Sequence, residues 1–201
     1  MSRLQFIGPL SPSSTMSSSI KPFTIEVPDE RLRRLKQKLA LTEFPAENVD
    51  NEPWAQGAPV ADIKRLVHYW EHGFDWRAAE AKLNAFPQFT TPIAVDNFGT
   101  YDVHLVHQKS QVENAIPLLF IHGWPGSFIE VTRILPELVK GGTDFPAFHI
   151  VAPSLIDFGF SAPSNKKNFN IDQHAEAYHK LMLALGYDEY GKHLIRLFSI
   201  H

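Results

Sequence analysis

The residues with the clearest chemical potential lie in one short segment, Leu118 to Glu130, with the sequence LLFIHGWPGSFIE. Leu118 to Ile121 form an uninterrupted apolar run, as expected for a parallel strand that is buried on both faces. The following His-Gly-Trp-Pro-Gly sequence is rich in turn-forming residues. Ser127 and Glu130 have the spacing of a capping box, which predicts that a helix begins directly after the turn. Such a turn can aim a backbone N–H at an oxyanion that develops during a reaction.

The elements around this turn are expected to form a strand-helix-strand unit. The predicted helix runs from Ser127 to Lys140, and a second apolar run, Phe148 to Ala152, follows it. This order indicates two parallel strands joined by a crossover helix. A last helix is predicted to begin near Asn170, where Gln173 completes a capping-box pattern, and to stop at Gly186. Its expected inner face is Ala175, Tyr178, Met182 and Leu185.

The preceding part of the chain predicts helices followed by a hairpin. Leucines at positions 32, 35 and 39 recur at helical spacing, Ile63 to Trp70 indicate a second helix, and Asp75 is a candidate cap for a third. Phe23 to Val27 alternate like a short strand. Turn residues around Asn97 and Gly99 separate two alternating segments, 89–95 and 101–108, which is typical of a hairpin. We interpret three tryptophans as core anchors rather than as a ligand cage: Trp54, Trp70 and Trp76.

Other residues with nucleophilic side chains are poorly placed. Ser199 lies in Phe-Ser-Ile-His, which lacks the glycines of a Gly-x-Ser-x-Gly elbow. Asp188 precedes the predicted strand His193 to Ile200, and we interpret it as a loop residue or a cap. The terminal His201 is interpreted as an untethered end.

The histidines do not predict a metal centre. Four of them, His68, His72, His104 and His107, are expected on helix or strand surfaces. His104 and His107 lack the alternate-residue spacing that would place both side chains on one strand face. The chain has no cysteine, so a cysteine-based metal site and a disulfide framework are excluded.

Composition and charge are those of an ordinary globular domain. The chain has 201 residues, 44% of them hydrophobic, and its 19 basic and 22 acidic residues give a formal net charge of -3. No basic patch indicates nucleic acid or an anionic membrane as a partner. No stretch of the serine-rich N-terminus is apolar enough for a membrane span, so we expect a soluble, cytoplasmic protein. Organelle targeting by this leader is the alternative, and Met16 is a second candidate start.

The turn and its flanks resemble a known family. HGWPGSF resembles the HGxP oxyanion element of the epoxide hydrolases in the α/β-hydrolase superfamily, and specifically their microsomal-type branch. Three further blocks, Pro22 to Ala40, His68 to Thr91 and His149 to Leu155, are similar to the N-terminal half of that family. The resemblance extends to about Tyr187.

The resemblance implies a role for each residue of the turn. Trp124 would supply a backbone N–H to the oxyanion hole, while His122, Gly123 and Pro125 would support the turn, and Phe128 would line a pocket. The family's nucleophilic aspartate, catalytic histidine, acid and lid tyrosines have no counterpart that we assign in this chain. Asp157 departs from the Pro-Gly that is usual at its loop. No cofactor and no metal are implied.

The predicted fold class is α/β: an N-terminal helical collar and the first part of an α/β-hydrolase sheet, truncated before the nucleophile elbow. The expected divisions are a disordered leader (1–21), an epoxide hydrolase N-terminal region with the collar and hairpin (22–110), a partial hydrolase core (111–190) and a divergent tail (191–201). We interpret the divergence of this tail as the result of a premature termination, a retained intron or a faulty gene model.

The expected activity is hydrolysis of a small apolar epoxide to a vicinal diol through an aspartyl ester, with this chain inactive alone. A first alternative is a non-catalytic interaction protein that binds a full-length relative or forms a homo-oligomer. A second is a serine esterase that uses Ser199.

Overall fold

The computed structural model describes residues 19–46, 54–55 and 57–194. The chain divides into two compact units. The sheet unit comprises Met1–Thr24 and Phe86–His201, and the helical unit comprises Ile25–Ala85. Each unit is described separately below.

The sheet unit contains a six-stranded sheet with the order β1-β2-β3-β5-β4-β6. Strands β2 and β3 form the predicted antiparallel hairpin, with Asn97 (φ 65°) and Gly99 (φ 108°) in the left-handed region at its turn. Glycine and asparagine adopt this region with the least strain, which explains why the chain reverses there. The strands are β1 (Lys21–Pro22), β2 (Gln88–Val95), β3 (Gly99–Gln108), β4 (Ile116–Ile121), β5 (Phe148–Pro153) and β6 (Gly191–Leu194).

The second half of the sheet is parallel. Strand β4 pairs with β5, where Leu118 lies opposite Ile150, and with β6, where Ile121 lies opposite Leu194. The carboxyl ends of these three strands therefore meet at one edge, where open α/β sheets build their sites. The predicted α/β class and the predicted parallel pairing are confirmed.

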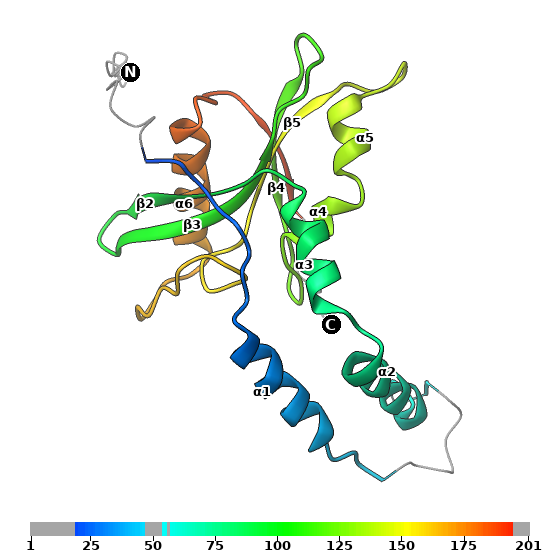
Figure 1. Cartoon of the computed structure of the whole chain (residues 1–201). Helices are drawn as coiled ribbons and strands as arrows, with labels where there is room; N and C mark the ends of the chain where they lie inside the picture. The colour runs from blue at the N-terminus through cyan, green and yellow to red at the C-terminus, as the bar shows by residue number, and fades with distance from the viewer. Residues whose placement is uncertain (1–18, 47–53, 56, 195–201) are drawn as a thin grey trace, which may run out of the picture. The chain divides into compact units, whose positions relative to one another are not determined.

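Three helices pack on the two faces of this sheet. In Figure 1, α6 (Ile171–Ala184) covers one face, and α4 (Ile129–Thr132) and α5 (Leu135–Lys140) lie on the other. Helix α6 and the sheet enclose the main core. Its most buried members are Val103, Leu105, Val151, Ile156, Ala177, Leu181 and Met182.

The prediction of a single helix from Ser127 to Lys140 is wrong. The chain forms two helices there, α4 and α5, with a break at Arg133 and Ile134. Pro136 is the physical reason. Proline has no N–H to continue the helical bonding, and its ring clashes with the preceding turn, whereas it is tolerated in the first turn of a new helix. Pro136 lies in the first turn of α5.

Helix α6 follows its prediction closely at both ends. The side chain of Asn170 accepts at the helix start, the Gln173 side chain accepts the Asn170 N–H across 3.0 Å, and the capping box is complete. Gly186 ends the helix with φ 87°. The inner face is rotated slightly from the prediction, since the buried residues are Ala177, Tyr178, Leu181 and Met182.

The helical unit contains α1 (Asp29–Ala40), α2 (Val60–His72) and α3 (Trp76–Asn84), and all three predicted helices are confirmed. Asp75 caps α3 by accepting the Ala78 N–H across 3.0 Å. The strand predicted from Phe23 to Val27 is wrong. The N–H groups of Ile25 and Val27 donate to side chains of α3, across 2.8 Å and 2.7 Å, and so do not join a sheet ladder.

The tryptophans of the helical unit are more exposed than predicted. Trp54 and Trp70 are 65% and 48% exposed, so their interpretation as core anchors is wrong. Helix α2 has no buried residue at all, although Ile63, Leu66 and Trp70 recur on one of its faces. An apolar helix face without cover marks a surface that another element can bury.

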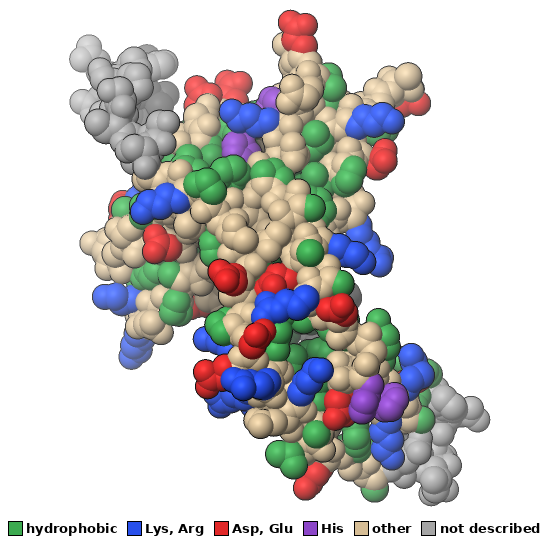
Figure 2. Space-filling model, in the orientation of Figure 1, with side chains coloured by type: hydrophobic (Ala, Val, Ile, Leu, Met, Phe, Trp, Pro, Cys, Tyr) green, Lys and Arg blue, Asp and Glu red, His purple; other side chains and the backbone are tan. Residues whose placement is uncertain are grey.

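Charges are interspersed on the face of the molecule drawn in Figure 2. Figure 2 shows Lys and Arg side chains intermingled with Asp and Glu, without a large field of one sign. Among the described residues, no helix combines the length and apolar character that a membrane crossing requires.

Candidate active site

The candidate oxyanion turn, residues 122–128, leaves the carboxyl end of β4 and leads into α4. The peptide bond between Trp124 and Pro125 is cis. The helix begins at Ile129, not at Ser127 as predicted. Ser127 Oγ accepts the Ile129 N–H at 3.4 Å, and the capping box predicted for Ser127 and Glu130 does not form.

Glu130 instead places its carboxylate beside Gly126. A Cβ atom at position 126 would lie 1.8 Å from Glu130 Oε1 and 2.8 Å from the carbonyl oxygen of Gly123. Both distances are below van der Waals contact, so this position of the turn accepts only glycine without a shift of its neighbours. The other carboxylate oxygen, Glu130 Oε2, is buried and has no hydrogen-bond partner among the described residues.

The His122 side chain bonds on both sides of its ring. Nδ1 lies 3.0 Å from the carbonyl oxygen of Gly123, and the N–H of Leu155 lies 3.1 Å from Nε2. A carbonyl oxygen can only accept and a backbone N–H can only donate. The ring is therefore neutral, with its proton on Nδ1. His122 is 2% exposed and connects the turn with the loop after β5.

Trp124 lies at an exposed position of the turn. Within the part of the chain that the structure describes, its N–H makes no hydrogen bond. Its side chain is 63% exposed. A donor that serves an oxyanion must be free of intramolecular partners, so this N–H meets the first requirement for that task.

Behind the turn lies a buried cluster centred on His104, which the sequence analysis wrongly placed on a strand surface. His104 is fully buried, and its ring lies edge-on to Phe128 with 4.9 Å between the centroids. Nδ1 lies 2.8 Å from Ser154 Oγ, and Nε2 lies 2.9 Å from Gln88 Oε1. Burial lowers the pKa of His104 to about 4. Phe128 is itself 2% exposed, so its side chain belongs to this cluster.

A second histidine cluster lies toward the amino end of β5. His107 Nε2 is 3.1 Å from the hydroxyl of Tyr187, and the ring of His149 stacks on the same tyrosine. Burial, with a smaller contribution from Lys109, lowers the pKa of His107 to about 4 and also lowers the pKa of His149. His68 and His72 are exposed, as predicted. Among the described residues, no group of three or more His, Asp or Glu side chains could hold a metal ion.

The loop after β5 contains the Asp157 that departs from the family pattern. Asp157 has φ 74°, in the left-handed region that favours glycine. Its Oδ1 accepts the N–H of Ser164 across 2.6 Å, and this bond holds the loop closed. An aspartate tolerates the left-handed region better than most residues because its short side chain can bond locally.

Three residues that the sequence analysis weighed as catalytic candidates remain. Asp188 is exposed and accepts the N–H of Glu189 across 3.1 Å, as a loop residue does. Ser199 and His201 lie outside the described residues. Strand β6, which the sequence placed at His193 to Ile200, begins at Gly191 and pairs with β4, so its carboxyl end lies beside the start of the turn.

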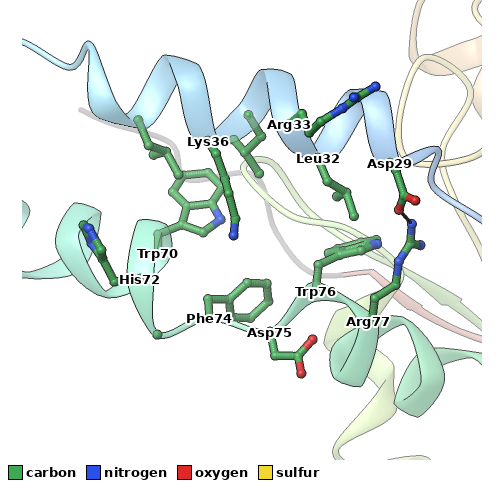
Figure 3. A pocket seen from close by; sticks show the side chains of 13 residues that line it. Asp29, Leu32, Arg33, Lys36, Trp70, His72, Phe74, Asp75, Trp76 and Arg77 are labelled. Carbon is green, nitrogen blue, oxygen red and sulfur yellow. Dashed lines mark hydrogen bonds and ion pairs between the residues drawn. The ribbon is translucent and has the colours of Figure 1, made fainter.

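The helical unit contains a groove that the sequence analysis missed. Figure 3 shows Trp70, Phe74 and Trp76 on the side of α2 and α3, facing Leu32 of α1. The groove has a volume of about 750 Å³. Arg77 closes one end through ion pairs with Asp29 and Glu80, the latter at 2.6 Å. The leucines that recur at helical spacing on α1 could have predicted the wall of the groove that α1 forms.

Two family models define the class of this protein. Residues 116–191 match the family model of the alpha/beta hydrolase fold, and residues 20–131 match that of the epoxide hydrolase N terminus. The chain belongs to the epoxide hydrolase family.

Individual relatives agree with this assignment. The chain is 36% identical to Epoxide hydrolase 1 of Oryctolagus cuniculus over 187 residues, and 36% identical to Juvenile hormone epoxide hydrolase 2 of Ctenocephalides felis over 184 residues. These alignments cover 89% of this chain but 40% and 38% of the relatives. The crystal structure of juvenile hormone epoxide hydrolase from the silkworm Bombyx mori is similar with a TM-score of 0.76 and 28% identity, over 87% of this chain and 46% of that one. The chain thus spans less than half the length of the relatives it matches.

Proposed function

We propose that this chain forms the N-terminal part of an epoxide hydrolase and that its turn contributes one donor of the oxyanion hole. The observation that carries the proposal is the Trp124 N–H, which is without a partner in the described part of the chain. It lies in the turn after β4, inside the segment that matches the epoxide hydrolase N terminus. Gly123, Pro125 and the neutral ring of His122 would hold this N–H in place.

The proposed reaction has two steps. A carboxylate oxygen of an aspartate bonds to a ring carbon of the epoxide as the ring C–O bond breaks, and a nearby donor protonates the departing oxygen. Water, deprotonated by a histidine, then adds to the ester carbonyl. The resulting oxyanion accepts the Trp124 N–H. Its collapse breaks the bond from the carbonyl carbon to the diol oxygen, which takes the proton held by the histidine. The carboxylic acid that remains loses its proton to the donor of the first step, which restores the carboxylate.

The described residues would supply the turn and its support. No described carboxylate is assigned as the nucleophile, and neither the base, the acid nor the tyrosine donors are assigned to described residues. The substrate class we propose is a small apolar epoxide, and the reaction needs no cofactor because water and side chains supply every proton and nucleophile.

Hydrolysis of styrene oxide tests the proposal. The 201-residue polypeptide is compared with a version extended by the C-terminal part of the rabbit relative. We expect diol formation above the uncatalysed rate only in the extended version, because the nucleophile would enter with the extension. A matched extended version in which its aspartate nucleophile is replaced by asparagine controls for background. An inactive extended version that is folded would contradict the proposal.

A second candidate function is a non-catalytic partner of a full-length epoxide hydrolase. The uncovered face of α2, with Ile63, Leu66 and Trp70, favours it. Light scattering of this chain mixed with the full-length rabbit relative tests it. A complex that Leu66→Glu abolishes would support this candidate, and separate elution at micromolar concentration would reject it.

We also propose a cytoplasmic location, which the absence of cysteine and the mixed surface charge support. Fractionation of cells that express the chain with a C-terminal tag tests it. Recovery of the tag in an organelle fraction would contradict it.

A further inference from the structure

The loop after β5 is held by side chains from two other elements at consecutive peptide groups. His122, after β4, accepts the N–H of Leu155 across 3.1 Å. Tyr178, on α6, accepts the N–H of Ile156 across 2.7 Å. Ile156 is fully buried and Tyr178 is 3% exposed, so water does not compete for these bonds.

The first of these bonds fixes the tautomer of the His122 ring. Because the Leu155 N–H occupies Nε2, the imidazole proton must lie on Nδ1, where it reaches the Gly123 carbonyl oxygen at 3.0 Å. Gly123 directly precedes Trp124. The orientation of the peptide group that carries the Trp124 N–H therefore depends on the position of the Leu155 N–H.

The second bond is directed by a histidine on the same helix. His174 Nδ1 lies 3.1 Å from the Tyr178 hydroxyl, and the two rings are stacked with 24° between their planes. The hydroxyl accepts the Ile156 N–H with one of its lone pairs, and its proton can be donated to His174 Nδ1. Burial lowers the pKa of His174, which favours a neutral ring, and in a neutral ring an unprotonated Nδ1 can accept this proton. The capping box at Asn170 fixes the start of α6 beside this pair.

We infer that Tyr178 is a positioning residue for the oxyanion turn. It holds the Leu155–Ile156 segment where the Leu155 N–H selects the Nδ1–H form of His122, and this form in turn anchors the Gly123 carbonyl next to the Trp124 N–H. The inference deepens the proposed function and rests on the role that we propose for Trp124.

Removal of the hydroxyl separates this role from packing. Tyr178→Phe keeps the ring in the core but leaves the buried Ile156 N–H without an acceptor, which is unfavourable if the segment does not move. Movement of the segment relieves that cost and withdraws the Leu155 N–H from His122. Tyr187→Phe is the matched control, because Tyr187 also bonds a histidine ring, that of His107, at 3.1 Å.

Nitrogen-15 spectra of the histidine rings provide the measurement. In the unaltered chain we expect His122 to show a protonated Nδ1 and an unprotonated Nε2. In Tyr178→Phe we expect averaged shifts of the two nitrogens, and in Tyr187→Phe we expect the unaltered His122 pattern. Circular dichroism establishes that each variant is folded at the temperature used.

Two results would overturn the inference. One is a proton on Nε2 of His122 in the unaltered chain, a measurement that needs no variant. The other is an unchanged His122 pattern in folded Tyr178→Phe.

Kinetics of the extended version link the inference to turnover. We expect Tyr178→Phe to lower kcat about tenfold with a smaller change in KM, and to accumulate the ester, because a misplaced donor slows the step with the oxyanion. Unchanged kcat would count against the inference. If the extended version without substitutions hydrolyses no epoxide, the proposed function fails, while the nitrogen-15 result still decides the position of the turn.

Discussion

Nδ1 of His104 lies 2.8 Å from Oγ of Ser154, and the two residues come from the adjacent strand β3 and the end of β5. The ring also contacts Phe128, so it joins the hairpin, the loop after β5 and the oxyanion turn. A residue in this position affects stability as well as the turn.

Replacement of His104 by leucine should destabilise the sheet unit. The hydroxyl of Ser154 would lose its ring partner inside the core, and we expect the free energy of unfolding to fall by about 2 kcal/mol. Urea denaturation measures this change. His68→Leu, at an exposed position of α2, is the control and should leave the free energy of unfolding nearly unchanged. Equal effects of the two substitutions would show that burial of His104 is unimportant.

Stability should fall in mild acid. The folded pKa values of His104 and His107 are about 4, below an unfolded value of about 6.5, so the unfolded chain binds more protons between these values. Stability is therefore fully present above pH ~6.5, declines as the pH falls, and levels off below pH ~4, with on the order of 3 kcal/mol lost for each ring. Urea denaturation midpoints measured across this pH range give the slope of stability against pH. His107→Gln should reduce this slope. A slope that this variant leaves unchanged would contradict the assignment of part of it to His107.

Alanine at position 126 should distort the candidate oxyanion turn. Its Cβ would collide with Glu130 Oε1 and with the Gly123 carbonyl oxygen. We expect a loss of about 2 kcal/mol in the free energy of unfolding, consistent with overpacking. Adding Glu130→Ala should recover part of the loss, because one of the two collisions disappears. Gly191→Ala is the control, since its nearest contact would be an ordinary 3.6 Å.

Substitutions at Asp157 should separate backbone strain from side-chain bonding. Asparagine keeps an acceptor for the Ser164 N–H and tolerates φ 74°, so Asp157→Asn should change stability by less than about 0.5 kcal/mol. Alanine loses the bond and retains the strain, and we expect Asp157→Ala to cost about 2 kcal/mol. Thermal denaturation compares the two variants. A loss at asparagine equal to that at alanine would contradict the role of the bond.

The exposed face of α2 should make the isolated chain self-associate. Ile63, Leu66 and Trp70 lie on one side of the helix and are all exposed. Sedimentation velocity should show concentration-dependent association that Leu66→Glu weakens. Ala61→Glu adds the same charge on the opposite side and should leave association unchanged. A monomer at all concentrations would contradict this prediction.

Local patterns predicted the elements well because their causes are local. The capping box at Asn170 and Gln173 and the turn at Asn97 depend on residues within a few positions of one another. Pro136 is an equally local signal, and it divides the helix predicted from Ser127 to Lys140. His104 could not be predicted in the same way, because its partners Ser154 and Gln88 are brought to it only by the sheet.

The exposure of α2 was unpredictable for a different reason. Its apolar spacing indicates only that one face prefers to be buried, and within the described residues Ile63, Leu66 and Trp70 of this face stay partly exposed. For the candidate site, the sequence indicated the turn and the residues in it. It could not indicate Tyr178, whose hydroxyl acts on a peptide group far away in the chain.

The two ends of the helical unit are tied to each other. Asn84 donates to the carbonyl oxygen of Ile25 across 2.9 Å and accepts the Ile25 N–H across 2.8 Å, so the first residue and the last but one of this unit are neighbours. Segments whose ends meet in this way can be cut out, replaced or inserted elsewhere with a short joint. Residues 25–85 can thus be exchanged as one segment between relatives. We expect the resulting chimaeras to keep the sheet unit intact.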